Sequence, residues 1–271
     1  MSIFEAFILG LTQGLTEFLP VSSSGHLRFV PAFFGWADPG AFFTATIQLG
    51  TMAAVVIYFW HDLWRIAGSW GRSLTDRSRR SELDARMGWY LVIATIPISV
   101  FGLAFKNQIE SGARNLYLIG TVLIVLGIIL AIADRMARRV RDVDQVGRAD
   151  AIWVGLAQAL ALIPGTSRSG ATITAGLFLG LTREAAARFS FLMSIPAVVL
   201  SGLYGLTELL GGDSTDLLGL AIATVVAFVS GYASIAFLLR WLTSHSMMVF
   251  VIYRIGMGAL VIALAASGII S

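Results

Sequence analysis

Residues 10–26 read GLTQGLTEFLPVSSSGH, and residues 155–170 read GLAQALALIPGTSRSG. Both stretches follow the pattern GLxQxL, then a proline, and then a hydroxyl-rich tip that ends in glycine. The second resembles a distorted copy of the first, with a slip of one residue near the proline. Hydroxyls, a carboxylate, an imidazole and a guanidinium are costly in hydrocarbon. Their presence in two matching tips predicts a buried functional site.

The rest of the chain is apolar. Of its 271 residues, 57% are hydrophobic and 13% are charged, and the mean hydropathy is +0.81. A soluble domain carries about 25% charged residues, so this composition indicates an integral membrane protein. It predicts an all-α fold, because a backbone in lipid must satisfy its own hydrogen bonds. The net charge of +3 does not indicate nucleic-acid binding, and the lack of cysteine excludes disulfides and thiolate chemistry. Residues 1–5 carry no basic stretch, so we expect no cleaved signal peptide.

Six segments are long and apolar enough to form transmembrane helices, each of which needs about 20 residues. They are residues 41–60, 87–105, 115–133, 184–210, 216–240 and 248–269. Two shorter apolar segments, 3–19 and 151–163, each end at a proline. Short helices are expected after them, at 23–35 and 168–181. Each pair is therefore predicted to be a re-entrant helix–loop–helix, which enters the membrane and returns on the same side.

The arginines predict the orientation in the membrane. Loops 61–86 and 134–148 contain six and five arginines, and two spans separate them. The positive-inside rule makes both loops cytoplasmic. Both termini and loop 106–114 are then expected outside. The first re-entrant pair enters from outside and the second from the cytoplasm, so the two tips approach the midplane from opposite faces.

This arrangement is an inverted-topology repeat, a design that places a binding site where broken helices meet. We expect one membrane domain, residues 1–271, whose halves cover 1–133 and 150–271. A basic cytoplasmic loop, 134–149, joins them. The repeat continues beyond the tips, because AFFTATI after the first tip overlays on ARFSFLM after the second.

The first tip, residues 20–26, follows a buried carboxylate. Gln13 and Glu17 are four residues apart and share a helix face. Glu17 lies in an apolar run and is a candidate metal ligand or general base, although a Glu at an interfacial helix end is the alternative. Ser22, Ser23 and Ser24 can cap a helix, and the free N–H groups beyond such a cap form an anion site. His26 is a candidate base, proton shuttle or nucleophile, and bonding to a carbonyl is its simpler role.

The second tip, residues 165–170, contains Arg168 between apolar helices. A guanidinium matches two phosphate oxygens at once, whereas bonding to backbone carbonyls is the alternative role. Thr166, Ser167 and Ser169 add hydroxyl donors. Together the tips suit a phosphorylated substrate whose lipid tail lies in the bilayer. Arg254, within a predicted span, is a further candidate for lining the cavity.

These motifs resemble the bacterial undecaprenyl-diphosphate phosphatase family, the BacA-type bacitracin-resistance proteins. The resemblance covers essentially the whole chain. It rests on QxxxE at 13–17, FLPVSSSGH at 18–26, PGTSRSGAT at 164–172, FSFLMSIP at 189–196 and YR at 253–254.

The resemblance implies hydrolysis of undecaprenyl diphosphate to the monophosphate and phosphate, which recycles the lipid carrier for peptidoglycan synthesis. It places Glu17, Ser23, His26 and Arg168 at catalytic positions, with Gln13, Ser22, Ser24, Thr166, Ser167 and Ser169 at substrate-binding positions. It implies a divalent metal, Mg²⁺ or Ca²⁺, near Glu17. It also implies a multi-pass protein of the bacterial inner membrane whose active site opens to the periplasm. Gln13 stands where the family has Glu or Gln, and Ser24 stands where threonine is frequent.

Several alternatives stay open at this point. The nucleophile can be Ser23, His26 or water. The sequence also does not decide whether the protein forms a homodimer. SSGH at 23–26 also resembles an element of the PAP2 lipid phosphatases, but their second histidine is missing, since no histidine lies between Arg168 and His245. A lipid-phosphate transporter or flippase would use the same midplane site, because broken helices in inverted repeats typify transporters.

Overall fold

The computed structural model describes residues 1–105, 115–209 and 216–270. These residues form helices and one isolated bridge pair, Arg141 with Leu181, but no strand. The α-helices are α1 (Ile3–Phe18), α2 (Ser23–Phe34), α3 (Gly40–Tyr58), α4 (Trp60–Thr75), α5 (Leu83–Ala104), α7 (Leu116–Met136), α8 (Arg148–Ala159), α9 (Arg168–Phe178), α10 (Arg183–Leu209), α11 (Leu217–Leu242) and α12 (Met248–Ala266). Short 3₁₀ turns are η1 (Arg77–Ser81), η2 (Val143–Gln145) and η3 (Leu160–Leu162).

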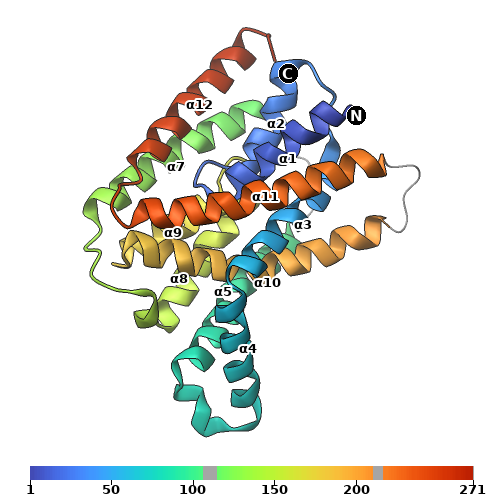
Figure 1. Ribbon diagram of the computed structural model, residues 1–271. Helices are drawn as coiled ribbons and strands as arrows, with labels where there is room; N and C mark the ends of the chain where they lie inside the picture. Colours follow the sequence, from blue (N-terminus) through green and yellow to red (C-terminus); the bar gives the residue numbers. More distant parts are fainter. Residues whose placement is uncertain (106–114, 210–215, 271) are drawn as a thin grey trace.

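The helix lengths and hydropathies confirm a multi-pass membrane protein. Four of the described helices, α5, α7, α11 and α12, are long and apolar enough to cross a bilayer. The bent pair formed by α3 and α4 raises this number to five. The 27-residue α10 covers the remaining predicted span, 184–210. The short helices α1, α2, α8 and α9 occupy the two predicted re-entrant pairs (Figure 1).

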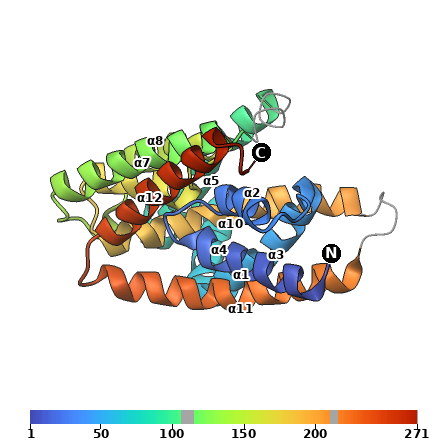
Figure 2. The same ribbon diagram turned by 90° about the horizontal axis from the view of Figure 1, so that it is seen from above.

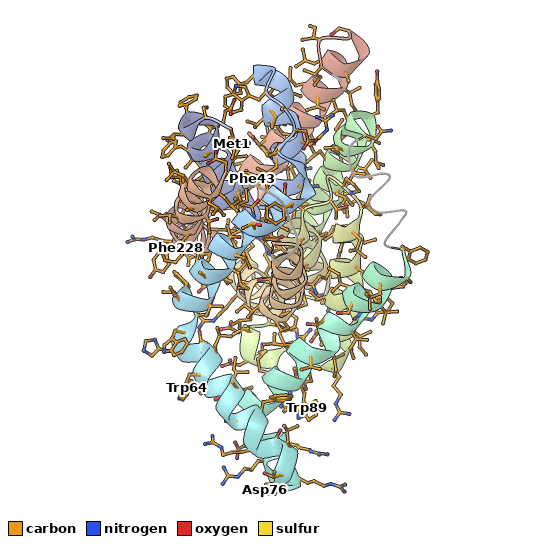
Figure 3. The ribbon with its side chains drawn as sticks, turned by 90° about the vertical axis from the view of Figure 1, so that its right-hand side faces the viewer. Met1, Phe43, Trp64, Asp76, Trp89 and Phe228 are labelled. Carbon is orange, nitrogen blue, oxygen red and sulfur yellow. The ribbon has the colours of Figure 1, made fainter. Side chains whose placement is uncertain are left out.

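One difference from the sequence prediction concerns residues 61–86, which were expected to form a loop. After a bend of 79°, the chain continues from α3 into α4. Ile66, Ser69 and Ser73 lie on the buried face of α4, whereas its other faces are largely polar or exposed. This helical spacing lets α4 pack on α5 instead of forming a loop. The α4–α5 hairpin projects from the body, with Trp64 on its outer side and Asp76 at its end (Figure 3).

The first helix of each motif packs against a helix from the other predicted half. Helix α1 lies along α11, and α8 lies along α5. A Cβ on Gly10 would lie 2.3 Å from the Ala223 carbonyl oxygen, and one on Gly155 would lie 2.7 Å from that of Ala94. Only glycine permits such close approach of two backbones. The equivalent positions of the two motifs therefore make equivalent contacts.

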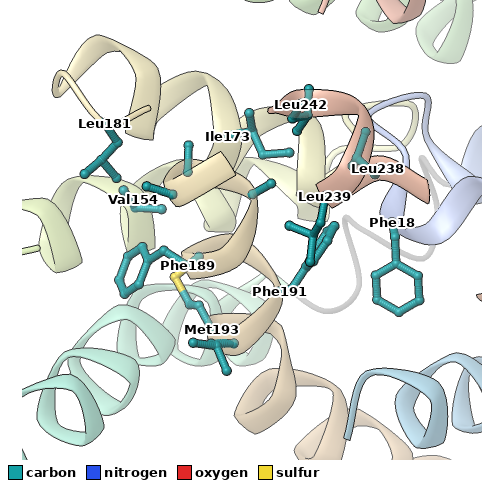
Figure 4. Close-up of a cluster of buried hydrophobic side chains, with 14 of the residues drawn as sticks. Phe18, Val154, Ile173, Leu181, Phe189, Phe191, Met193, Leu238, Leu239 and Leu242 are labelled. Carbon is teal, nitrogen blue, oxygen red and sulfur yellow. The ribbon is translucent and has the colours of Figure 1, made fainter. Parts of the chain in front are cut away.

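A large apolar cluster joins α10 to its neighbours. Phe189, Phe191 and Met193 of α10 are fully or almost fully buried, and Phe191 meets Phe18 edge-on at 5.3 Å between ring centroids. Ile173 of α9 and Leu238 of α11 belong to the same cluster (Figure 4). Phe18 immediately precedes the first tip, and Ile173 lies in the helix that follows the second. The cluster therefore fixes both tips to one core.

Ion pairs fasten the chain near the start of α8 and the end of α7. Arg141 donates to the Asp150 carboxylate and to the Leu179 carbonyl, and the hydrogen bonds to Asp150 raise the pKa of Arg141. Arg183 donates to the Asp134 carboxylate, which also accepts the N–H of Met247. The two chain termini lie at the other end of the molecule (Figures 1 and 2). The Met1 amine lies 3.9 Å from the Asp216 carboxylate there.

Candidate active site

The two tips share one unusual backbone conformation. Ser22 has φ 76° and ψ 94°, and Ser167 has φ 64° and ψ 109°. A positive φ is uncommon for residues other than glycine and costs on the order of 1–3 kcal/mol. Each serine caps the helix that follows, because its Oγ accepts the N–H of Gly25 or of Gly170. The resemblance between the two motifs therefore extends to their three-dimensional structure.

Glu17 connects the two tips. Arg168 Nη2 donates to Glu17 Oε1 at 2.7 Å, across 151 residues of sequence. The Ser23 hydroxyl donates to Glu17 Oε2 at 2.6 Å, and Gln13 Nε2 donates to the same oxygen at 3.1 Å. Gln13 also lies within 3.4 Å of the Thr51 hydroxyl. Four of the residues predicted from sequence are thus in direct contact.

This cluster is mostly buried, and it contains one unused donor. The Glu17 and Arg168 side chains are 7% and 13% exposed. Arg168 Nη1 is buried and has no hydrogen-bond partner among the described residues. A buried donor without an acceptor costs about 1–3 kcal/mol, and an anionic oxygen would remove that cost. Arg168 is therefore arranged to hold Glu17 with one nitrogen and an anion with the other.

His26 makes its hydrogen bonds to residues other than Glu17. Its Nδ1 lies 2.7 Å from the Ser22 carbonyl oxygen, and its Nε2 lies 2.6 Å from the Tyr253 hydroxyl. The ring also packs against Phe29, with 4.6 Å between centroids. Neither ring nitrogen is hydrogen-bonded to Ser23. In this arrangement the carboxylate of Glu17, rather than the imidazole, accepts the hydrogen bond from the Ser23 hydroxyl.

The remaining predicted hydroxyls have structural contacts of their own. Ser24 and Ser169 lie 3.3 and 3.1 Å from the capping oxygens of Ser22 and Ser167. Ser169 also donates to the Leu19 carbonyl at 3.0 Å, which joins the second tip to the first. The Thr166 Oγ1 is buried without a partner among the described residues. It is a second polar atom at the tips that is free to meet a ligand.

Arg254 has a role that sequence reasoning missed. Its side chain is 1% exposed, and among the described residues its guanidinium donates only to backbone carbonyls. It binds Pro20 O of the first tip at 3.2 Å and Thr166 O of the second at 3.0 Å. A Cβ on Gly170 would lie 2.6 Å from Arg254 Nη1, so that glycine leaves room for the guanidinium. The signal in the sequence was an arginine inside an apolar span.

The bond from Arg254 to Thr166 O also orients the second tip. The peptide between Thr166 and Ser167 is trans, so its N–H points away from its carbonyl. With the carbonyl bound to Arg254, the Ser167 N–H faces the opposite side. The first N–H groups of α9 have no partner within the helix. Together they form the kind of donor group that binds phosphate at a helix N-terminus.

A divalent metal would find oxygen ligands here. Within the described residues, no three His, Cys, Asp or Glu side chains are grouped closely enough to hold a metal ion by themselves. Mg²⁺, however, is commonly bound by one or two carboxylates together with substrate phosphates. Glu17 supplies one such carboxylate, and the neutral amide oxygen of Gln13 is a further oxygen ligand of the kind that Ca²⁺ accepts. The donor chemistry therefore fits an ion that binds together with a phosphorylated substrate.

The fold and the site define a class: a multi-pass helical membrane protein with a buried site suited to an anionic phosphate group. The family model described as bacitracin resistance protein BacA matches residues 6–260. The chain belongs to this family.

Similar proteins from several bacteria match essentially the whole chain. A protein from Nocardioides sp. is 51% identical over 100% of this chain and 99% of its own length. A protein from Kineococcus radiotolerans is 55% identical over 99% of this chain and 95% of its own. One from Mycolicibacterium smegmatis is 52% identical over 100% and 99%. All three are named undecaprenyl-diphosphatase, and these names give no support to the transporter alternative.

We expect Arg254→Met to lower the free energy of unfolding by at least about 3 kcal/mol, because the carbonyls of Pro20, Gly165 and Thr166 lose a buried donor. Thermal unfolding in detergent, followed by tryptophan fluorescence, measures this loss. Arg240→Met is the matched control, since Arg240 is exposed at the end of α11. Equal midpoints for the two variants would show that Arg254 does not hold the tips together.

Proposed function

We propose that this protein hydrolyses undecaprenyl diphosphate to undecaprenyl phosphate and inorganic phosphate, and so recycles the lipid carrier of peptidoglycan synthesis. The observation that carries the proposal is the contact between Ser23, Glu17 and Arg168, in which Arg168 Nη1 has no partner within the described part of the chain. It combines a hydroxyl whose proton already has an acceptor with a guanidinium that has a free donor. Phosphoryl transfer requires mainly such positioning and charge stabilisation.

In the proposed reaction, Arg168 and the N–H groups of both tips hold the diphosphate. The Ser23 oxygen attacks the terminal phosphorus while its proton moves to Glu17 Oε2, along the hydrogen bond already present. The bond from that phosphorus to the bridging oxygen breaks, and undecaprenyl phosphate leaves. Water then hydrolyses the phosphoserine, which restores Ser23 and releases phosphate. His26 is the alternative acceptor of the proton, and His26 and water are the alternative nucleophiles.

Glu17 and Gln13 are the side chains that would hold Mg²⁺ or Ca²⁺. When bound, such an ion supplies positive charge that neutralises the phosphate oxygens. Arg168 provides the same kind of stabilisation from the second tip. Because Glu17 also pairs with Arg168, its single carboxylate links the two sources of positive charge.

The proposal includes six transmembrane helices and two re-entrant pairs in an inverted repeat, with halves 1–133 and 150–271. Two observations support it: the tips have the same backbone conformation, and α1 and α8 pack on equivalent helices of the opposite half. The positive-inside rule then puts α4, η1 and the start of α5 in the cytoplasm and both termini in the periplasm. The protein lies in a bacterial inner membrane, and its site opens to the periplasmic side. The predicted outer loop 106–114 lies outside the described residues.

Removing the Arg168 guanidinium should abolish efficient phosphate release. In detergent with Mg²⁺ and undecaprenyl diphosphate, we expect Arg168→Ala to lower kcat/KM by at least about 100-fold, or about 2.7 kcal/mol. Arg168→Lys should retain little activity, because an ammonium cannot bind Glu17 and phosphate through one planar group. Arg240→Ala is the matched control. Wild-type rates in a folded Arg168→Ala protein would refute this role, and no release by the wild type would refute the function.

The first tip predicts two separable effects. Ser23→Ala should abolish turnover but leave binding of the lipid diphosphate largely intact, because an attacking group acts mainly in the transition state. Glu17→Gln should raise the Mg²⁺ concentration needed for half-maximal activity. Ser99→Ala in α5 is the control. Full turnover in Ser23→Ala would leave His26 or water as the nucleophile, and an unchanged Mg²⁺ requirement in Glu17→Gln would restrict Glu17 to the role of base.

The orientation can be measured because the chain contains no cysteine. Ser78→Cys lies in η1, and Ser267→Cys lies just after α12. In intact cells, a membrane-impermeant thiol reagent should label only the cysteine at 267, and permeabilised cells should also show labelling at 78. The opposite pattern in intact cells would reverse the proposed topology.

A further inference from the structure

Tyr253 in α12 contacts the site, and the proposed reaction gives it no role. Its hydroxyl lies 2.6 Å from His26 Nε2, across 227 residues of sequence. The two rings are parallel within 8°, with 5.6 Å between their centroids. Tyr253 is 41% exposed, whereas His26 is 4% exposed. The imidazole is therefore covered, and its outer nitrogen is occupied by a residue on the surface of the helix bundle.

The hydrogen-bond directions follow from the chemistry of the partners. The Ser22 carbonyl oxygen can only accept, so Nδ1 must carry a proton and donate to it. In a neutral imidazole, Nε2 is then the acceptor, and the Tyr253 hydroxyl donates to it. Nε2 holds the one basic lone pair of the ring. Neutral His26 can therefore accept a proton only at Nε2, the atom that Tyr253 occupies.

Another contact restricts the motion of the His26 ring but does not select between its two flipped orientations. Phe29 is fully buried and packs against the imidazole at 54°, which restricts tilting. Phe29 offers no polar atom, so it does not distinguish between the two ring flips. The carbonyl on one side and the hydroxyl on the other make that choice. Second partners of this kind commonly fix the tautomer and orientation of functional histidines.

We propose that Tyr253 is a positioning residue for the phosphatase reaction: its hydroxyl holds the His26 ring in one tautomer, with Nε2 as the acceptor. This inference rests on the proposed function. It explains why a residue distant in sequence and half-exposed at the bundle surface directs a hydroxyl inward to the first tip. It also assigns part of the function of the YR pair at 253–254, whose second member, Arg254, holds the backbone of both tips.

The experiment compares Tyr253→Phe with Tyr232→Phe. Tyr232 lies in α11, is also 41% exposed and packs edge-on against Tyr58. Tyr232→Phe therefore removes a tyrosine hydroxyl of equal exposure that does not contact the site. Phosphate release from undecaprenyl diphosphate gives kcat and KM. ¹⁵N NMR of histidine-labelled protein in detergent gives the state of Nε2. Only three histidines contribute signals, and His61 and His245 are exposed.

We expect Tyr253→Phe to lower kcat about tenfold and to change KM less than about twofold, because an indirect role costs less than loss of an acid–base group. The ¹⁵N resonance of His26 Nε2 should move in Tyr253→Phe and stay in place in Tyr232→Phe. Unchanged or faster turnover in Tyr253→Phe, or an unmoved Nε2 resonance, would overturn the inference. Absence of phosphate release by the wild type would instead refute the proposed function, and the Nε2 resonance would still decide whether Tyr253 positions His26.

Discussion

The hydrogen bonds from Arg254 to the tip carbonyls are the constraint on which the site depends. Irregular backbone cannot face lipid, because its carbonyl and N–H groups would be unsatisfied. Both tips are irregular, and each contains a serine with positive φ. A single buried guanidinium meets Pro20 O, Gly165 O and Thr166 O. The Val21 and Thr166 N–H groups bond to Leu19 O and Ile163 O, so the Ser167 N–H, whose carbonyl partner Thr166 O is held by Arg254, is the one directed to the other side for a ligand.

The same arrangement sets the charge of the site. Glu17 is the carboxylate that the described contacts bring to the tips, and Arg168 and Arg254 are the two cations. A negatively charged ligand would therefore balance the buried charge, whereas an empty site carries an excess of positive charge. Burying unbalanced charge costs free energy unless polar groups surround it. The carbonyls around Arg254 supply that solvation, and Glu17 partly neutralises Arg168.

The sequence predicted most of the helices, because their lengths follow from hydropathy and their ends follow from prolines and caps. Segment 3–19 became Ile3–Phe18, and the helix predicted at 168–181 became Arg168–Phe178. It also predicted that Glu17, Ser23 and Arg168 belong to one site. It did not predict α4, whose arginines suggested a loop although its buried positions repeat with helical spacing. The bonds of His26 to Tyr253 and of Arg254 to both tips depend on tertiary packing, which local patterns do not contain.

The crossed packing of α1 on α11 and of α8 on α5 has a consequence for the order of folding. Helix α1 leaves the ribosome first, but the helix that covers Gly10 is made more than two hundred residues later, as Ala223 and its neighbours are inserted. Helices α1 and α2 must wait in an incomplete environment during most of synthesis. Contacts of such long sequence separation form slowly, since a large loop must close before they contribute. The membrane segments made in between, together with the insertion machinery, have to shelter Glu17 and the serines until the second half arrives.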